Sequence, residues 1–178
     1  MKFKKQKIKG VYLITHNPYN DKRGLFSRVL CKKLFKKIGL NVVQTNISSN
    51  KKKNTLRGFH YQVLNSSETK LVTCIQGKIY DIVLDLRKTS KTYKKWISFK
   101  LDAKKLNSIV IPKGCANAFL TLENRTIVFY HTNKYYNSNR EKGIKYNDKE
   151  FEFQWPEKIK IISKKDNNLP LYKKNQKQ

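Results

Sequence analysis

The chain has 178 residues, the size of one ordinary domain, and its 40 Lys and Arg against 12 Asp and Glu give a formal net charge of +28. Its apolar runs are short and interrupted, far from the ~20 apolar residues of a membrane-spanning helix. The first segment, MKFKKQKIKG, is basic but no apolar stretch follows it, so nothing directs export. We expect one cytoplasmic domain, residues 1–178, with no membrane partner.

The basic excess first suggests a nucleic-acid binder, because a positive field attracts polyanions. Only six of the forty basic residues are Arg, however, whereas phosphate and groove recognition favour the bidentate guanidinium. The lysines are also scattered along the whole chain instead of forming one stripe or tail. A solvated basic surface explains the composition better, although a field that attracts an anionic small molecule stays open. We expect no nucleic-acid partner.

Strand-like segments dominate from the amino terminus onward. They are rich in Val, Ile, Tyr, Phe and Thr and are separated by Gly, Pro, Asn and Asp, a spacing typical of a sandwich or barrel. The sequence predicts strands at residues 10–15, 24–30, 42–48, 55–61, 70–76, 78–85, 96–101, 108–111, 118–122 and 126–132. We therefore expect an antiparallel all-β body.

One surface helix is predicted at residues 31–38. Leu34, Phe35 and Ile38 share one side, lysines occupy the other, and Gly39 is a typical helix stop. The helix should cover part of the β body.

The middle of the chain shows a period of two. In residues 78–86, Tyr80, Ile82 and Leu84 share one face, which we expect to be core, and Asp81 and Asp85 share the other. The two aspartates are expected to make structural hydrogen bonds. Gly77 and the segment 112–114 are typical of tight turns, and both look like hairpin connections.

Beyond residue 136 the pattern thins into a polar segment with isolated apolar anchors. Ile144, Phe151, Phe153 and Trp155 should hold this segment against the barrel, and residues 173–178 should fray. The three cysteines, Cys31, Cys74 and Cys115, are odd in number and lack CxxC spacing. They are therefore expected to be reduced, mostly packed thiols.

His60 stands out because hydrogen-bonding side chains crowd around it. The string LRGFHYQ places Arg57, His60, Tyr61 and Gln62 within six positions, where a strand that only packs would alternate apolar and polar residues. From these residues alone, a functional histidine and an ordinary surface histidine are equally acceptable.

LRGFHYQ and the strings around it resemble the dTDP-4-dehydrorhamnose 3,5-epimerase family. DKRGLF and VQTNIS precede it, and TKLVTCIQGKIYDIVLDLRKTS, IPKG, AFLTL, GIKYND, QWP and SKKDNNLPL follow in family order. Any one string would be weak, but together they extend almost from end to end. The resemblance implies a jelly-roll barrel of the cupin type, usually a homodimer, with the sugar in its interior.

The implied chemistry needs no cofactor. A proton is removed from carbon beside the C4 ketone of a nucleotide-linked 4-keto-6-deoxy sugar and returned on the opposite face, inverting C3, C5 or both. By resemblance, His60 is the general base and Asp166 the carboxylate that orients it. Lys70 stabilises the enolate oxygen, and Tyr130 is the acid that reprotonates the enolate.

The resemblance also implies a set of substrate contacts. Forked guanidinium groups suit the diphosphate, and amides suit the sugar and nucleotide. The positions are Arg23, Arg28, Gln44, Asn46, Arg57, Asn117, Glu141 and Lys165.

The chain departs from the family at two of these positions. Asn117 stands where the family has a second histidine; an amide can donate a hydrogen bond but cannot shuttle a proton at neutral pH. Arg28 stands where an acidic residue is common, so the nucleotide base is an expectation only. No metal is expected, since His60 is followed by Tyr61 and Gln62 instead of the His-x-His pair of metal-binding cupins.

Several functions stay open. Beside a 3,5-epimerase, the sequence allows a single-position epimerase or a 3,4-ketoisomerase of the same fold. The two departures also allow a homologue that binds a sugar nucleotide with impaired turnover. A nucleic-acid-binding β-barrel is the remaining alternative, based on the net charge and the aromatic content.

Overall fold

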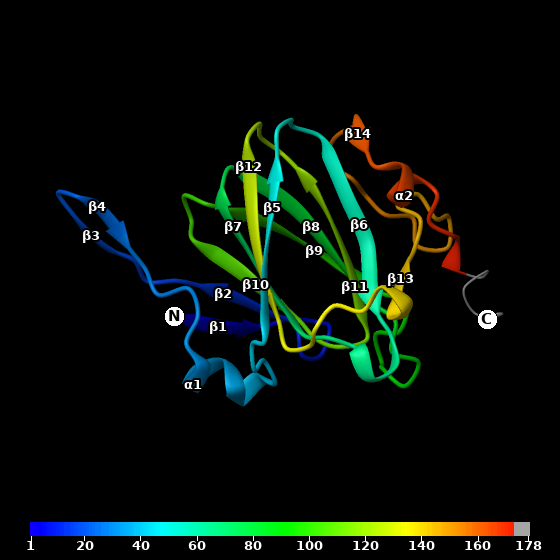
Figure 1. Cartoon of the computed structure of the whole chain (residues 1–178), viewed down its shortest axis with the longest axis horizontal. Coiled ribbons are helices and arrows are strands. Elements are labelled where there is room, and N and C mark those ends of the chain that lie inside the picture. Colours follow the sequence, from blue (N-terminus) through cyan, green and yellow to red (C-terminus); the bar gives the residue numbers. More distant parts are fainter. Residues whose placement is uncertain (173–178) are drawn as a thin grey trace.

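The structure is a computed structural model that describes residues 1–172, so the predicted fraying of residues 173–178 lies outside the described part. Strands dominate it (Figure 1). They are β1 (Lys2–Lys5), β2 (Tyr12–Thr15), β3 (Tyr19–Asp21), β4 (Gly24–Phe26), β5 (Gln44–Asn50), β6 (Thr55–Gln62), β7 (Lys70–Gln76), β8 (Lys78–Asp85), β9 (Trp96–Asp102), β10 (Asn107–Ile111), β11 (Cys115–Thr121), β12 (Thr126–Thr132), β13 (Glu141–Gly143) and β14 (Ile161–Ile162). The helical segments are short: α1 (Lys32–Phe35), η1 (Lys36–Ile38), η2 (Leu64–Ser66), η3 (Ser138–Arg140) and α2 (Lys164–Asn167).

Two sheets face each other and enclose the barrel interior (Figure 1). The first has the order β1-β2-β10-β7-β12-β5, and the second has the order β13-β6-β11-β8-β9, with β14 added in parallel to β6. All other neighbouring strands are antiparallel. The predicted all-β jelly roll is confirmed.

The long strands were predicted best. β7, β8 and β12 have the predicted bounds. The short strands β1, β3, β13 and β14 were not predicted, because segments such as KFKK and EKG carry no apolar alternation. The strand predicted at residues 24–30 is only β4, which pairs with β3 in a separate two-stranded hairpin.

The prediction that two tight turns connect hairpins is wrong. Gly77 and residues 112–114 do make tight turns, since Gly77 has φ of +74° and Gly114 has φ of +79°. Each turn, however, carries the chain from the first sheet into the second, from β7 to β8 and from β10 to β11. Local turn chemistry is the same for both kinds of connection, so the sequence could not separate them.

The predicted core face of β8 is buried, and its other face is buried as well. Ile79 and Val83 pack in the barrel interior, and Ile82 and Leu84 pack on the outside of the second sheet. A period of two separates the faces of a strand but does not show that another segment covers the outer one.

That covering segment is the one predicted to wrap the barrel. Ile144 and Phe151 are buried against the second sheet, and the Phe153 ring stacks on Phe59 with 4.3 Å between centroids. Trp155 packs against the same cluster. The predicted wrapping is therefore confirmed for residues up to 172.

The predicted helix covers the first sheet, but it is shorter than expected. One α turn continues as a 3-10 turn and ends at Gly39, which has φ of +80°. Phe35 is buried against Leu71 and Val110, whereas Leu34 is exposed, so the expected shared apolar side is wrong for Leu34. Consecutive residues of an α-helix lie ~100° apart around its axis, so Leu34 can face solvent while Phe35 faces the sheet.

The cysteines are free, and Cys74 and Cys115 are buried, as predicted. Burial raises the pKa of each of these two thiols to about 12, which keeps them protonated. Across residues 1–172, no helix has the length and apolar character required to cross a membrane.

Candidate active site

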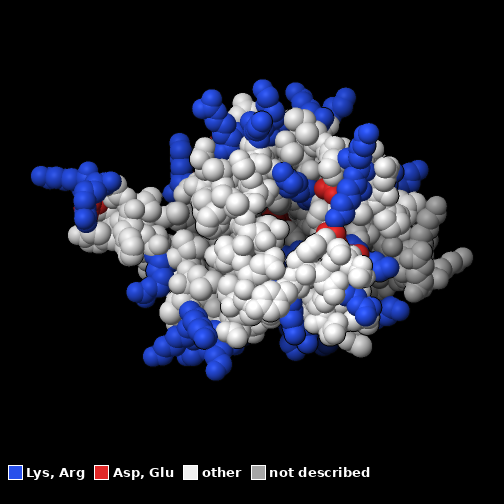
Figure 2. Space-filling model, in the orientation of Figure 1, with Lys and Arg blue, Asp and Glu red and all other residues white. Residues whose placement is uncertain are grey.

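A cavity of about 560 Å³ opens between the two sheets. It is lined mainly by β5, β6, β7, β11 and β12, with β13 and α2 at one side. In Figure 2, acidic atoms on the barrel itself show mainly beside a recess near its middle, whereas lysines project around the outline. Ten of the twelve site residues predicted from the sequence line the cavity: Gln44, Asn46, Arg57, His60, Lys70, Asn117, Tyr130, Glu141, Lys165 and Asp166.

Strand register explains how the first sheet contributes its residues. Tyr130 on β12 lies opposite Asn46 on β5 and Val72 on β7. Lys70 lies two residues before Val72, so the period of two places its side chain on the same face. Lys70, Asn46 and Tyr130 therefore all face the cavity.

In the second sheet, a β-bulge in β6 turns the functional side chains toward the cavity. His60 pairs with Asn117 and Arg57 with Phe119, so one extra residue on β6 is accommodated between the two pairs. Without that residue, Arg57 and His60 would point to opposite faces. Gly58 makes the bulge possible: its φ is +111°, and a Cβ there would lie 2.6 Å from the Asn117 carbonyl oxygen.

His60 is held by Asp166. The Nε2 atom of His60 lies 2.9 Å from Oδ1 of Asp166, whose Oδ2 accepts the Gly58 amide at 3.1 Å. Ser163 caps the short helix that carries Asp166. Burial by itself raises the Asp166 pKa, but the bonds from His60, Gly58 and Ser163 outweigh it and hold the pKa below its usual value. An ionised carboxylate only accepts, so Nε2 carries a proton, and in the neutral ring Nδ1 has the lone pair.

Lys70 lies across the cavity floor between two side chains. Its Nζ donates to Oδ1 of Asn117 at 3.2 Å and forms an ion pair with Oε1 of Glu68 at 3.1 Å. The other end of the Asn117 amide donates to Oδ2 of Asp81 at 3.3 Å. Burial raises the pKa of Asp81 to about 8, although the Asn117 hydrogen bond and the Lys70 charge oppose the shift.

Glu68 and Asp81 were not among the predicted site residues. Asp81 was expected only to make structural hydrogen bonds, and its bond to Asn117 does cross to the neighbouring strand β11. Glu68 could have been found, because it lies two residues before Lys70 and an extended chain puts both side chains on one side.

Tyr130 lines the cavity on the sheet opposite His60. Burial, together with the negative charge of Glu68, raises the pKa of its phenol, while Arg57 opposes the shift. Tyr130 therefore stays protonated at neutral pH and can act as an acid.

The rim of the cavity carries further polar groups. Glu141 accepts hydrogen bonds from Lys165 Nζ and, at 2.9 Å, from Tyr136 Oη. Burial alone would raise the Glu141 pKa, but the hydrogen bonds from Lys165 and Tyr136 outweigh burial and hold the pKa below its usual value. The carboxylate is therefore ionised at neutral pH. Arg57, an exposed residue of β6, donates to Oδ1 of Asn50 at 2.7 Å.

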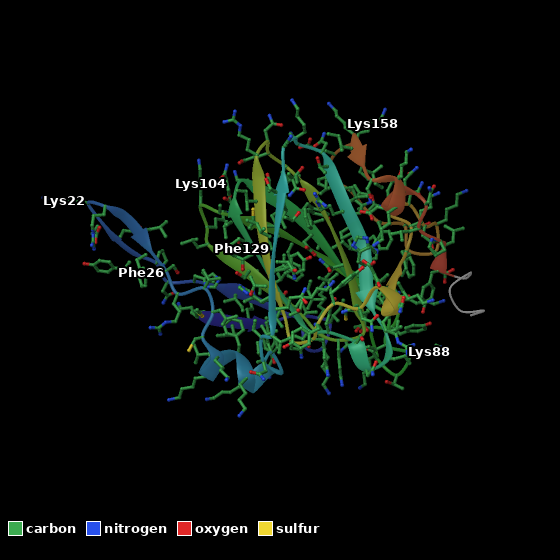
Figure 3. The ribbon with its side chains drawn as sticks, in the orientation of Figure 1. Lys22, Phe26, Lys88, Lys104, Phe129 and Lys158 are labelled. Atoms are coloured by element: carbon green, nitrogen blue, oxygen red, sulfur yellow. The ribbon has the colours of Figure 1, made fainter. Side chains whose placement is uncertain are left out.

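The structure does not bring Arg23 and Arg28 to the cavity. Arg23 lies at the tip of the β3–β4 hairpin, which projects away from the barrel, and its side chain is 87% exposed and paired with Asp21 at 2.6 Å (Figures 1 and 3). Arg28 lines a second, smaller hollow at the base of the hairpin, with Tyr19 and Phe26. Neither arginine lines the cavity of its own chain, and their predicted contact with substrate stays a prediction.

The cavity combines a base, an acid and a cation. His60 offers a lone pair, Tyr130 a proton, and Lys70 a positive charge, all within one partly enclosed space. Within residues 1–172, no group of three His, Cys, Asp or Glu side chains is arranged to hold a metal ion.

The jelly-roll barrel is shared with solved epimerases, and this similarity places the chain among the cupin-type isomerases. The chain belongs to the dTDP-4-dehydrorhamnose 3,5-epimerase family, whose profile matches residues 5–174. The predicted family and the predicted enzyme class, an isomerase of the epimerase type, are confirmed.

Known relatives are similar to this chain over almost their whole length. The dTDP-4-dehydrorhamnose 3,5-epimerase of Shigella flexneri is 35% identical over 167 residues, which cover 92% of each chain. The crystal structure of the Bacillus anthracis enzyme with TDP and PPi bound is similar with a TM-score of 0.91 and 37% identity, covering 96% of this chain and 98% of that one. NovW of Streptomyces spheroides, a 4-keto-6-deoxy sugar epimerase, has a TM-score of 0.93 and 27% identity, covering 99% of this chain and 90% of that one.

Proposed function

We propose that residues 1–178 form a single cytoplasmic domain that epimerises a nucleotide-linked 4-keto-6-deoxy sugar at C3, C5 or both, for deoxysugar or surface-polysaccharide synthesis. The observation that carries the proposal is the convergence of His60, Lys70 and Tyr130 in one cavity, with Asp166 behind the histidine. The relatives' names support this substrate class.

The proposed reaction moves one proton off carbon and another onto it. Nδ1 of His60 takes the proton beside the C4 ketone, and the electron pair moves into the C4 oxygen to give an enolate. Lys70 donates to that oxygen, where negative charge develops. Tyr130 then delivers its proton to the opposite face. The enzyme is left with a protonated His60 and a deprotonated Tyr130, which reset by exchange with water.

The remaining cavity residues are proposed to bind substrate. Arg57 offers its guanidinium to the diphosphate, and Lys165 can exchange its partner Glu141 for a phosphate oxygen. Gln44 and Asn46, which hydrogen-bond each other at 3.0 Å, supply amide groups at the cavity wall. No cofactor is needed for this chemistry.

We further propose a homodimer. The projecting hairpin exposes large apolar side chains, with Tyr19 67%, Leu25 55% and Phe26 75% exposed. Such a patch is typical of an interaction site. A second copy that covers it could receive Arg23 in its own cavity, which would give this arginine its predicted substrate contact.

Solvent exchange tests the proposal. The substrate, dTDP-4-keto-6-deoxyglucose, is incubated in D₂O and deuterium at C3 and C5 is read by NMR. We expect incorporation with inversion for the natural protein and a loss of roughly 10² to 10⁴ in rate for His60→Asn. Tyr130→Phe should retain exchange through His60 but lose inversion.

His131→Asn is the matched control, because His131 bonds Thr45 at 2.9 Å and does not line the cavity. It should leave the rate unchanged. Absence of deuterium at both carbons with the natural protein would refute the epimerase proposal, and retained dTDP binding in that case would identify a binding homologue.

A single-position epimerase is the second candidate, favoured by Asn117. Its amide is bonded on one side to Lys70 and on the other to Asp81, and it cannot shuttle a proton as a histidine does. Deuterium at only one carbon would select this reaction, and movement of the carbonyl would select a 3,4-ketoisomerase.

A further inference from the structure

We propose that Glu68 is a positioning residue of this cavity, whose carboxylate fixes the Lys70 ammonium for the reaction. The inference rests on the proposed epimerase function and names a residue that the sequence did not assign.

Both oxygens of the Glu68 carboxylate are engaged. Oε1 pairs with Lys70 Nζ at 3.1 Å, and Oε2 accepts from Gln62 Nε2 at 2.7 Å. The side chains of Glu68 and Lys70 are only 10% and 12% exposed, so water screens the pair little. The ion pair is thus part of the cavity floor and not a loose surface contact.

Gln62 in turn fixes Glu68. It is 4% exposed, and its Oε1 accepts the Asn137 amide at 2.7 Å, which orients its NH₂ group toward the carboxylate. The carboxylate therefore cannot rotate freely. Its position is set by β6, through Gln62, and by the segment that leads from residue 133 to the cavity rim.

The other partners of Lys70 are uncharged. They are the Asn117 amide oxygen at 3.2 Å and the His60 carbonyl oxygen at 3.5 Å. Asp81 lies behind Asn117 and, with a pKa of about 8, is protonated at neutral pH. Within residues 1–172, Glu68 is thus the one carboxylate that forms an ion pair with Lys70.

A fixed ammonium matters because lysine is long and flexible. Stabilisation of an enolate is strongest when the charge is already in place and needs no reorganisation. The ion pair also partly neutralises the positive charge that Lys70 presents to the substrate. The arrangement therefore favours a fixed position of the ammonium over the strongest possible positive field.

The phenol of Tyr130 lines the same cavity, and burial, together with the negative charge of Glu68, raises its pKa. The charged and titratable groups that act on its phenol are Glu68, Glu141 and Tyr136, which raise its pKa, and Arg57, which lowers it. Removing the Glu68 charge should therefore lower the Tyr130 pKa and move the alkaline limb of the kcat profile to lower pH.

The test is Glu68→Gln, which keeps the size and the hydrogen-bonding capacity but removes the charge. We expect kcat to fall by roughly 10-fold to 100-fold with little change in KM, as for a misplaced catalytic group. Glu68→Asp should recover part of the loss. Glu157→Gln is the matched control, because Glu157 pairs with Lys53 at 2.8 Å outside the cavity, and it should change neither kcat nor the pH profile.

Two readouts need no turnover. NMR of isotope-labelled lysine ammonium groups, with Lys70 assigned by its loss in Lys70→Met, should show a protected Lys70 signal that disappears in Glu68→Gln. Titration of ring-labelled tyrosine, with Tyr130→Phe for assignment, should show a lower Tyr130 pKa in Glu68→Gln.

The outcomes separate the two proposals. An unchanged Lys70 signal together with an unchanged Tyr130 titration would overturn the role of Glu68, whether or not the enzyme turns over. If both change while the natural protein shows no deuterium exchange, the placement of Lys70 stands and the epimerase proposal fails. An unchanged kcat in a protein that does exchange would also overturn the positioning role.

Discussion

Asp81 is fully buried and bonds Asn117 through Oδ2, and its other oxygen, Oδ1, has no hydrogen-bond partner among residues 1–172. Its pKa is about 8 in the folded protein, compared with an unfolded value near ~4. Between these pH values the folded state binds one more proton than the unfolded state. This group therefore makes the free energy of unfolding decrease as pH rises from ~4 to about 8, and its contribution is constant above that range.

Asp81→Asn removes this titration while keeping the shape and an acceptor for Asn117. We expect the variant to gain stability relative to the natural protein as pH rises from ~5 to ~9. Urea unfolding across that range measures the difference. Groups such as Asp166 are common to both proteins and cancel in the comparison; a difference that does not depend on pH would show that Asp81 is ionised in the fold.

The bulge in β6 is the element on which the site depends most. It turns Arg57 and His60 to one side, and it fits only because residue 58 has no side chain. Residue 58 also donates its amide to Asp166, so a shift there moves the base and its carboxylate together.

Gly58→Ala should therefore lower the stability by more than backbone strain alone. The added Cβ would meet the backbone of Asn117 and Ala118 at 2.6 and 2.7 Å. We expect a large fall in exchange activity and a lower Tm. Gly39→Ala is the control: its φ of +80° carries similar strain of about 1–3 kcal/mol, but nothing lies within 4 Å of the new Cβ. Equal losses in the two variants would refute the steric argument.

At the scale of the whole molecule, the basic charge and the hairpin arm are the two distinctive features. On the face drawn in Figure 2, Lys and Arg side chains project around the outline and do not gather in one stripe. The arm carries its apolar side chains beyond the barrel, and Figure 3 shows Lys22 at its tip and Phe26 along its length. A lone chain would leave these rings in water.

We expect the protein to sediment as a dimer, and Leu25→Ser combined with Phe26→Ser to shift it to a monomer by analytical ultracentrifugation. Ile161→Ser is the control, because Ile161 is 44% exposed on β14, on the opposite side of the barrel from the arm (Figure 1). If Arg23 serves the partner's cavity, the monomeric variant should also lose activity. A natural protein that is monomeric at all concentrations would contradict the proposal.

The sequence by itself determined the all-β class, the family and ten of the residues that line the cavity. β-branched alternation is a local property, so β7, β8 and β12 could be located from it. The spacing of motifs around LRGFHYQ placed ten of twelve predicted residues in one cavity.

Only the tertiary structure decided which strands share a sheet, which faces are covered, and which residues touch. Gly77 looks the same in a hairpin as in a connection between sheets, and the outer face of β8 is buried only because a distant segment lies on it. Local spacing puts Glu68 and Lys70 on one side, but the bond from Asn137 that orients Gln62 toward Glu68 is long-range. The projection of the hairpin that leaves Arg23 outside the cavity is likewise not encoded in a local pattern. Local chemistry fixes the elements, but long-range packing decides which side chains meet.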